Sequence, residues 1–378
     1  MKENKARVIA FYLPQYHPIP ENDKYWGKGF TEWTNVAKAK PLFRGHYQPH
    51  IPADLGFYDL RLPEVREAQA ELARDAGIEG FCYYHYWFGN GKMLLQKPFE
   101  EVLRLGKPDF PFCLCWANHD WTTKTWVKGS SMVNNTMIAQ QEYLGEQDDI
   151  KHFEYCLRAF KDHRYITIEG KPIFLIYDPL SFPNVKEFMN RWNFLAKKNN
   201  LKGIYFIGVT TGRQSSYKIV TNLGFDGVCH NRRWEAEAKA AGFRFVRRMQ
   251  SLLGWHLGIS LMKYDYNKVV RNYDTPENKL ENCYPVITPG FDRTPRAGRR
   301  AGIYVNSSPK NFKKHVAEIC KSIQDKDDDH RLVFLSAWNE WGEGNYMEPD
   351  LKWGHGYLEA LKLSLIHISE PTRRRGIS

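Results

Sequence analysis

Two glutamates three residues apart, Glu340 and Glu343, form the pattern in this sequence with the clearest chemical meaning. They lie in segment 336–344 (SAWNEWGEG), directly after an apolar run typical of a buried strand, and Glu348 follows shortly after. If the turn that carries them is helical, both carboxylates point to one side. Such a pair suits the breaking of a glycosidic bond, where one group protonates the departing oxygen and the other manages charge or a proton on the sugar.

A second interpretation of the two glutamates is structural. Acidic residues favour the positive end of a helix dipole, so Glu340 and Glu343 could simply begin the last helix of the chain. That interpretation accounts for one glutamate, but it does not explain Trp338, Trp341 and the two glycines around them. We therefore favour a catalytic pair.

Polar and aromatic side chains also follow other predicted strands. Donors, acceptors and ring faces of this kind are what a sugar-binding cleft needs. A lone histidine is often a structural group, and the Asp-Pro pair at 178–179 is typical of a turn, so a structural role is the alternative at each position. The strand-end candidates are Tyr84 and His85, Trp116 with Asn118, His119 and Asp120, Tyr177, and Asp292.

The elements that must position these residues form a regular series. Short apolar runs at 7–12, 80–84, 112–116, 173–177, 203–209, 227–229, 284–288 and 332–337 predict eight strands. Amphipathic stretches between them, such as 63–76, 150–161, 185–198 and 309–324, predict helices. Alternation over eight units predicts an α/β fold, a single (β/α)8 TIM barrel. The alternative, an open doubly wound sheet, lacks a nucleotide fingerprint, because the Gly-Asn-Gly-Lys at 89–92 has the wrong spacing.

Three connections are long, and each follows a strand. They come after the first, third and sixth predicted strands, at 13–62, from 116 through Trp126, and at 232–281. Loops of this length are usually functional. Because active sites of barrels lie at the carboxyl ends of the strands, we expect these loops to surround the site. The acidic run 325–329 precedes the eighth strand and is expected at the opposite end.

Composition narrows the class of ligand. With 42% hydrophobic residues in 378 the chain can bury a core, and 15% aromatic residues suggest a ligand with flat apolar faces, such as a sugar ring. The formal charge of +11 is spread along the chain without a nucleic-acid-binding signature, so we expect no nucleic-acid partner. The seven cysteines lack framework spacing and no second pair completes a zinc site, so we expect buried thiols and no metal.

No apolar run is long enough to span a bilayer and residues 1–5 carry no signal pattern, so we expect a cytoplasmic protein without a transmembrane segment. The segment 243–261, with Arg244, Arg247 and Arg248, could make weak peripheral contact with an anionic membrane, although an ordinary helix with a basic edge is the alternative. Residues 363–378 resemble a non-native read-through tail, which leaves 1–362 as the barrel and the true C-terminus missing.

Four motifs in order resemble one known family. The segments 11–17 (FYLPQYH), 26–36 (WGKGFTEWTNV), 80–88 (GFCYYHYWF) and 338–344 (WNEWGEG) look like the WbsX family, often labelled glycosyltransferase and similar to the family 99 endo-mannosidases and endo-mannanases. The resemblance covers about residues 7–361. It implies a (β/α)8 barrel acting on α-mannoside-like bonds of O-antigen, capsule or other surface polysaccharide. It also implies that Glu340 is the base that acts through the substrate 2-hydroxyl toward a 1,2-anhydro sugar, and that Glu343 is the acid and base.

The sequence therefore predicts a retaining glycosidase or transglycosylase that acts on an oligo- or polysaccharide without a metal or nucleotide cofactor. One alternative is a sugar-nucleotide-dependent glycosyltransferase of lipopolysaccharide biosynthesis, although the chain lacks a diphosphate-binding loop and an Asp-x-Asp at a strand's carboxyl end. Another is a non-catalytic glycan-binding barrel, which would not need the glutamate pair. Besides the strand-end candidates, the predicted substrate-binding residues are Tyr12, Gln15, His17, Trp33, Asn339, Trp341 and Glu348.

Overall fold

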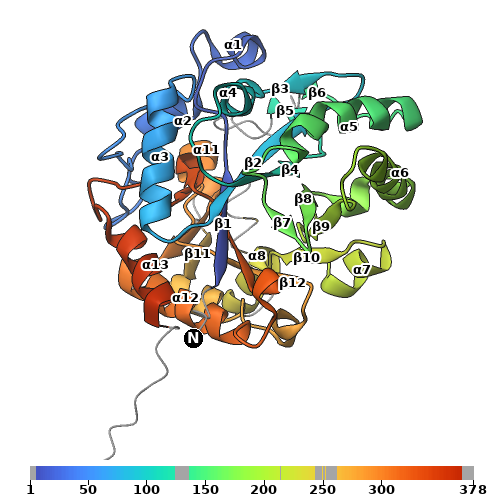
Figure 1. Ribbon diagram of the computed structural model, residues 1–378. Helices are drawn as coiled ribbons and strands as arrows, with labels where there is room; N and C mark the ends of the chain where they lie inside the picture. The colour runs from blue at the N-terminus through green and yellow to red at the C-terminus, as the bar shows by residue number, and fades with distance from the viewer. Residues whose placement is uncertain are drawn as a thin grey trace, which may run out of the picture.

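Eight parallel strands close into a barrel in the computed structural model, which describes residues 6–123, 136–212, 214–242 and 262–367 together with Met249 and Leu252. In their order around the barrel the strands are β1 (Arg7–Tyr12), β2 (Gly80–Trp87), β4 (Phe112–Trp116), β8 (Lys171–Ile176), β9 (Tyr205–Val209), β10 (Gly227–His230), β12 (Cys283–Ile287) and β14 (Leu332–Leu335). Pairing of β14 with β1, in the register Arg7↔Leu332, closes the circle (Figure 1). The predicted (β/α)8 fold is confirmed.

Helices cover the outside of the barrel between successive strands (Figure 1). Because both faces of a parallel sheet are then buried, its strands are continuous apolar runs, which is why they could be located in the sequence. The main helices are α3 (Pro63–Asp75), α4 (Lys97–Leu105), α5 (Glu146–Phe160), α6 (Val185–Lys198), α7 (Tyr217–Asn222), α8 (Arg233–Ala240), α10 (Tyr266–Val270), α12 (Pro309–Ser322) and α13 (Gly356–His367). The shorter elements include β3 (Met93–Leu94), β7 (Thr167–Ile168) and the 3₁₀ turns η2 (Pro179–Ser181), η3 (Pro276–Lys279) and η5 (Asp328–His330).

The three loops predicted to be long carry their own elements. The loop after β1 holds α1 (Pro20–Trp26) and α2 (Glu32–Lys38), and the loop after β4 holds the strands β5 (Trp121–Thr122) and β6 (Met137–Ala139). The segment after β10 contains α8, β11 (Met262–Asp265) and α10. The segment 243–261, named above for membrane contact, lies outside the described residues apart from Met249 and Leu252.

A fourth long loop, after β12, was not predicted. It contains α11 (Thr294–Ala297), the 3₁₀ turn η4 (Gly298–Arg300) and β13 (Gly302–Val305), and β13 pairs in parallel with β11 of the preceding insertion. A four-residue helix is too short to show apolar periodicity, so hydrophobic patterning did not distinguish this loop from an ordinary connection.

Much of the aromatic content is packing rather than ligand surface. Trp192 of α6 is fully buried, and its ring centroid lies 4.6 Å from that of Phe188 and 4.8 Å from that of Phe174 on β8. Trp338 and Trp341 are also buried, with exposed fractions of 0% and 1%. The aromatic excess, which we interpreted from the sequence as a sign of ligand stacking, is therefore in large part the core between the barrel and its helices.

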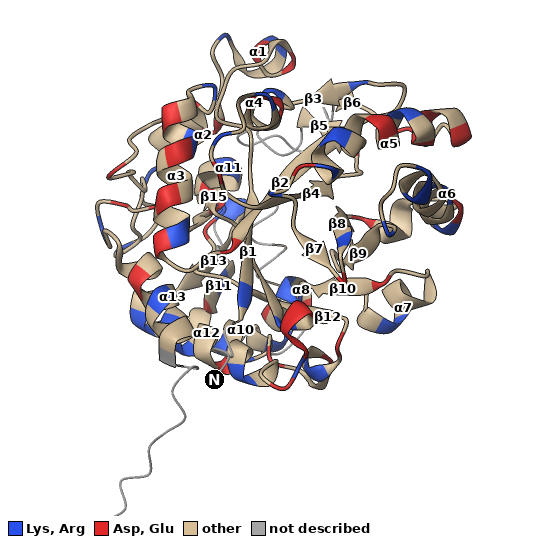
Figure 2. Ribbon diagram, in the orientation of Figure 1, with Lys and Arg blue, Asp and Glu red and all other residues tan. Residues whose placement is uncertain are grey.

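Lys and Arg are spread over helices around the barrel rather than gathered on one of them (Figure 2). Among the described residues no helix is long and apolar enough to cross a membrane. All seven cysteines are free and buried. Helix α13 continues through His367, with Ser364 and Leu365 buried, so the first part of segment 363–378 is helical, and residues 368–378 lie outside the described part.

A glycine at the start of β2 gives a test of barrel packing. A methyl group at Gly80 would lie 2.4 Å from the backbone oxygen of Pro111, so a neighbouring strand segment must move. We expect Gly80→Ala to lower the free energy of unfolding by about 1–3 kcal/mol, the usual cost of an overpacked core, in urea titration. The control is Gly212→Ala, because no atom of the described residues that are not its chain neighbours lies within 4 Å of a methyl group added there. Equal stability of both variants would contradict the close approach of these backbones.

Candidate active site

A cavity of about 310 Å³ opens at the carboxyl ends of the barrel strands. Phe11 and Leu13 come from the first strand and its loop, Tyr84 and Tyr86 from β2, and Ser336 from the residues after β14. The long loops supply further lining residues, as their position after strands predicts. Among these are Gln15, His119, Asp120, Trp121, Asn231, Arg233, Phe291 and Arg296.

Glu340 and Glu343 both line this cavity. They belong to a small hairpin in which β15 (Asn339–Glu340) pairs with β16 (Asn345–Tyr346) across the 3₁₀ turn η6 (Trp341–Glu343). In 3₁₀ geometry residues i and i+3 lie one above the other, so the two carboxylates share one side of the turn. The last helix, α13, begins only at Gly356, so the pair does not start a helix.

Gly342, between the two glutamates, is the point of closest packing beneath the pair. A methyl group there would lie 1.6 Å from Oε1 of Glu32 and 2.9 Å from Nε of Arg296. The turn can therefore sit directly on the Glu32–Arg296 ion pair only because this residue lacks a side chain.

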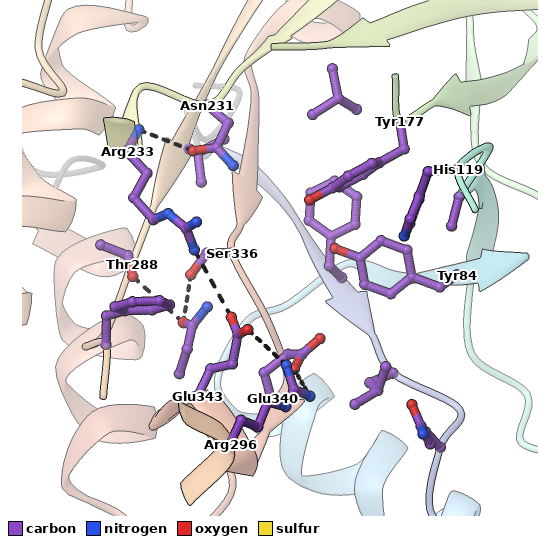
Figure 3. A pocket seen from close by; sticks show the side chains of 18 of the residues that line it. Tyr84, His119, Tyr177, Asn231, Arg233, Thr288, Arg296, Ser336, Glu340 and Glu343 are labelled. Carbon is purple, nitrogen blue, oxygen red and sulfur yellow. Dashed lines mark hydrogen bonds and ion pairs between the residues drawn. The ribbon is translucent and has the colours of Figure 1, made fainter. Parts of the chain in front are cut away.

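One guanidinium group joins the carboxylates of the site. Arg296 of α11 donates from Nε to Glu32 Oε1 at 2.8 Å and from Nη2 to Glu340 Oε2 at 2.7 Å. Its Nη1 lies 2.7 Å from Glu343 Oε1. The side chains of Glu32 and Arg296 are almost completely buried, and those of Glu340 and Glu343 are 13% and 18% exposed. The pair is thus held in one geometry by a shared, largely desolvated partner (Figure 3).

The two glutamates are electrostatically unequal. Burial raises the pKa of Glu340 to about 7, against the opposing effect of Arg296 and with help from the charges of Glu343 and Glu32. Burial acts on Glu343 too, but Arg296, Arg293 and Arg233 together hold its pKa below the usual value. As the pH falls below about 7, the pair therefore takes up one proton, mainly on Glu340.

The opposite wall of the cavity is aromatic and carries hydroxyl groups. Tyr84, Tyr177 and His119 face the glutamates across the cavity (Figure 3). The rings of His119 and Tyr177 lie 5.6 Å apart, and Tyr86 stacks on Trp121 with centroids 5.6 Å apart. Ring faces combined with hydroxyl and imidazole groups suit the apolar face and the hydroxyls of a sugar.

The structure brings part of the predicted set to this cavity. The predicted residues that line it are Gln15, Tyr84, His119, Asp120, Tyr177, Glu340 and Glu343. The predicted residues outside its lining are Tyr12, His17, Trp33, His85, Trp116, Asn118, Asp292, Asn339, Trp341 and Glu348.

Several of the outlying residues hold in place the hairpin that carries Glu340 and Glu343. The Asn339 side chain accepts from Leu13 N at 2.8 Å and donates to Leu13 O at 3.0 Å, which ties the hairpin to the end of β1. Trp341 stacks on Tyr346 at 3.8 Å, and its indole N–H donates to Glu348. Glu348 also accepts from Tyr58 and Gln69, and burial raises its pKa to about 7. These residues position the hairpin and do not reach the cavity.

The remaining outlying residues have local partners. Tyr12 donates to Gln69, His17 bonds the Pro14 carbonyl, and Trp33 donates to Tyr58 O. Trp116 donates to Trp87 O, and Asn118 holds the Asp178 backbone.

Asp292 lies beside a second cavity of about 320 Å³ that is formed partly by the loop after β1. Its carboxylate is in contact with His46, Gln48 and Thr294.

His85 points away from the cavity toward helix α5. Its Nε2 lies 2.8 Å from Nε2 of His152, and burial lowers the pKa of His85 to about 3. With Cys156 these histidines form the one group of His, Cys and acidic residues in the described part of the chain that is compact enough to hold a metal ion. None of the three lines the active-site cavity.

Sequence reasoning missed the basic side of the site. Arg296, Arg293 and Arg233 were not predicted, and neither was Glu32, although Glu32 lies inside the 26–36 motif. The contact between Arg296 and Glu32 joins residues 264 positions apart. A usable signal was the Asp-Arg-Thr-Pro-Arg run at 292–296, which places two arginines after a predicted strand.

Comparisons with known proteins agree with this architecture. Two solved structures, both covering 96% of this chain, have TM-scores of 0.55: the GH99 endo-alpha-mannosidase from Bacteroides thetaiotaomicron in complex with Bis-Tris-propane, 15% identical over 97% of its chain, and a "glycoside hydrolase-like protein", 16% identical over 94% of its chain. At these identities the likeness shows a shared fold.

Sequence comparison identifies the family as well as the fold. Uncharacterized protein WxcX of Xanthomonas campestris pv. campestris strain B100 is 34% identical over 361 residues, which are 95% of this chain and 50% of the relative, and the same protein of a second strain matches equally. The chain thus spans about half the length of the curated relatives it matches. A family model described as glycosyltransferase WbsX matches residues 8–361, nearly the whole barrel. The chain belongs to the WbsX glycosyltransferase family.

Proposed function

We propose that this glycan-processing barrel cleaves or transfers mannose-type glycosidic bonds of a surface polysaccharide, with net retention at the anomeric carbon. The observation that carries the proposal is the placement of Glu340 and Glu343 on one turn at the cavity, each held by the same Arg296 guanidinium. Paired carboxyl groups beside an aromatic, hydroxyl-bearing wall match the needs of glycosidic chemistry.

The proposed reaction has two steps. Glu340 removes the proton from the substrate 2-hydroxyl as that oxygen attacks the anomeric carbon, while Glu343 protonates the departing glycosidic oxygen. The product of this step is a 1,2-anhydro sugar. Glu343, now ionised, then deprotonates a water or an acceptor hydroxyl that opens the anhydro ring at the anomeric carbon, and Glu340 returns its proton to the 2-oxygen. Two inversions give net retention, and the nature of the acceptor decides between hydrolysis and transfer.

The protonation of the two glutamates bears on these roles. A base with a pKa of about 7 is stronger than an ordinary carboxylate, which suits Glu340. Glu343 starts ionised, so the single proton of the pair must be on Glu343 when the glycosidic bond breaks. Arg296 contacts both carboxylates, so it can stabilise the pair in either arrangement of that proton.

The direct test of the function is product analysis. The protein is incubated with a panel of α-mannosides and surface polysaccharides, with and without sugar nucleotides, and products are identified by mass spectrometry and NMR. Release or transfer of sugar without a nucleotide supports the proposal. Turnover that requires a sugar nucleotide would replace it with the glycosyltransferase alternative, and binding without any turnover would favour a glycan-binding barrel.

The two glutamates should differ in their dependence on the leaving group. Glu343→Gln should nearly abolish turnover of substrates with poor leaving groups and spare those that depart without a proton. Glu340→Gln should be slow with every leaving group. Positioned proton transfer is worth on the order of 10²–10⁴-fold in rate, so kcat/KM across a series of aryl glycosides separates the two variants.

A substrate change provides the control for this contrast. A 2-deoxy or 2-fluoro substrate lacks the hydroxyl that Glu340 deprotonates, so it should bind without reacting. Near wild-type rates in both glutamine variants would remove the pair from the chemistry. The opposite leaving-group pattern would exchange the two roles.

The pH dependence follows from the proton shared by the pair. The reactive state needs one proton on the two glutamates, and that proton is lost as pH rises through the raised pKa of Glu340, about 7. We expect kcat/KM to fall roughly tenfold per pH unit above that value in a profile from about pH 5 to 9.

Glu348 provides the matched control, because burial raises its pKa to about 7 as well but it does not line the cavity. Glu348→Gln should therefore leave the position of the alkaline limb unchanged. An alkaline limb that disappears in this variant would assign the titration to Glu348 and contradict the shared proton.

A further inference from the structure

Arg233, the first residue of α8, presents a guanidinium group to the active-site cavity. It lines the cavity with Arg296, and its side chain is 30% exposed, whereas that of Arg296 is 7% exposed. Figure 3 shows it extending from the end of β10 toward Glu343. Of the two arginines that line the cavity in the described part of the chain, Arg233 is the more exposed to solvent.

The contacts of Arg233 are long. Its Nη1 lies 3.9 Å from Glu343 Oε2 and its Nε lies 3.8 Å from Glu237 Oε1, beyond the 2.7–3.2 Å typical of an N–H···O hydrogen bond. Arg296, by contrast, contacts its three carboxylates at 2.7–2.8 Å. Within the described part of the chain, the donors of Arg233 are therefore not taken up by close carboxylate partners.

Two aromatic rings orient the Arg233 group. Its guanidinium carbon lies 4.6 Å from the ring centroid of Phe291 and 4.8 Å from that of Trp234. Phe291 itself lines the cavity. A guanidinium held against rings keeps its N–H donors directed along its edge, and a planar fork of this kind matches a carboxylate in a bidentate contact.

We propose that Arg233 recognises a carboxylate on the substrate, so that the glycan bound beside Glu343 contains an acidic sugar such as a hexuronic acid. This inference rests on the proposed function, because it names the substrate class of the same cavity. The neighbouring polar groups suit the remaining hydroxyls of such a sugar. Asn231 lies next to Arg233, and Tyr177 faces it from the other wall (Figure 3).

The charge of the whole protein supports an anionic substrate. The chain has 54 Lys and Arg against 43 Asp and Glu, a formal net charge of +11. A positive protein raises the local concentration and the association rate of a polyanion, and this effect does not need a basic patch on one face. A polysaccharide with repeated carboxylates would be attracted over a distance and then selected at Arg233.

The simpler explanation of Arg233 is that it only helps to keep Glu343 ionised. Arg293 provides the matched control for that role, because its Nε lies 3.4 Å from Glu343 Oε1 while its side chain does not line the cavity. Both arginines lower the pKa of Glu343. Removing either charge should disturb Glu343, but only removing Arg233 should alter the response to a substrate carboxylate.

The experiment compares two α-linked oligosaccharides that differ only at C6, one of mannose and one of mannuronic acid. Wild-type kcat/KM should favour the acidic one. Arg233→Gln should lower the acidic-to-neutral ratio by about 10- to 100-fold, the range for losing hydrogen bonds to a charged group, and Arg233→Lys should retain part of it. Arg293→Gln should slow both substrates alike and leave the ratio unchanged. A ratio that is unchanged in Arg233→Gln, or absent in the wild type, would overturn the inference.

Calorimetric binding separates this inference from the proposed function, since binding needs no turnover. Tighter binding of the acidic oligosaccharide that is lost in Arg233→Gln supports the inference even if no product forms, in which case the proposed function fails alone. Equal binding of both oligosaccharides overturns the inference even if the neutral one is cleaved. GDP-mannose serves as a competitor. Loss of its binding in Arg233→Gln, with uronate binding unchanged, would assign Arg233 to a diphosphate and also overturn it.

Discussion

The site depends on one buried guanidinium shared by three carboxylates. Glu32 comes from the loop after β1, Arg296 from the loop after β12, and the Glu340–Glu343 turn from the loop after β14, so their contacts tie three connections together at the mouth of the barrel. Breaking a buried ion pair by removing one partner costs about 3–5 kcal/mol, because the other charge is left uncompensated. The hairpin that carries the catalytic candidates therefore has little freedom to move without separating buried charges.

The same arrangement sets the protonation of the pair. Arg296 cannot neutralise three carboxylates, and burial penalises each uncompensated negative charge. Arg293 and Arg233 lie next to Glu343 and not Glu340, so the ionised form is favoured at Glu343 and the proton remains at Glu340. The packing of Gly342 on Glu32 and Arg296 belongs to this arrangement, since any side chain there would push the turn away from the guanidinium.

The sequence was informative where the physical signal is local. All eight barrel strands are continuous apolar runs, and Glu340 and Glu343 are visible as a pair because one short turn carries both. Arg296 and Glu32 could not be paired in advance, because their contact depends on how two loops fold over the barrel mouth. His85 and Trp116 were assigned to sugar binding because they end strands, and Asn339 because it lies beside Glu340, yet alternate residues of a strand point to opposite sides. Their side chains face helices or hold backbone instead.

The two walls of the cavity differ in chemistry: one is aromatic and neutral, and the other carries charged groups. On one side Tyr84, Tyr177 and His119 offer ring faces and neutral polar groups, and burial keeps the tyrosines protonated and His119 neutral near pH 7. They can bind a sugar without competing for its protons. On the other side the carboxylates of Glu340 and Glu343 lie beside the guanidinium groups of Arg296 and Arg233, and the raised pKa of Glu340, about 7, lets it exchange a proton at accessible pH. A sugar held against the neutral wall would thus present its reacting bond to the ionic one, and proton transfer would be confined to the face where the carboxylates and guanidinium groups lie.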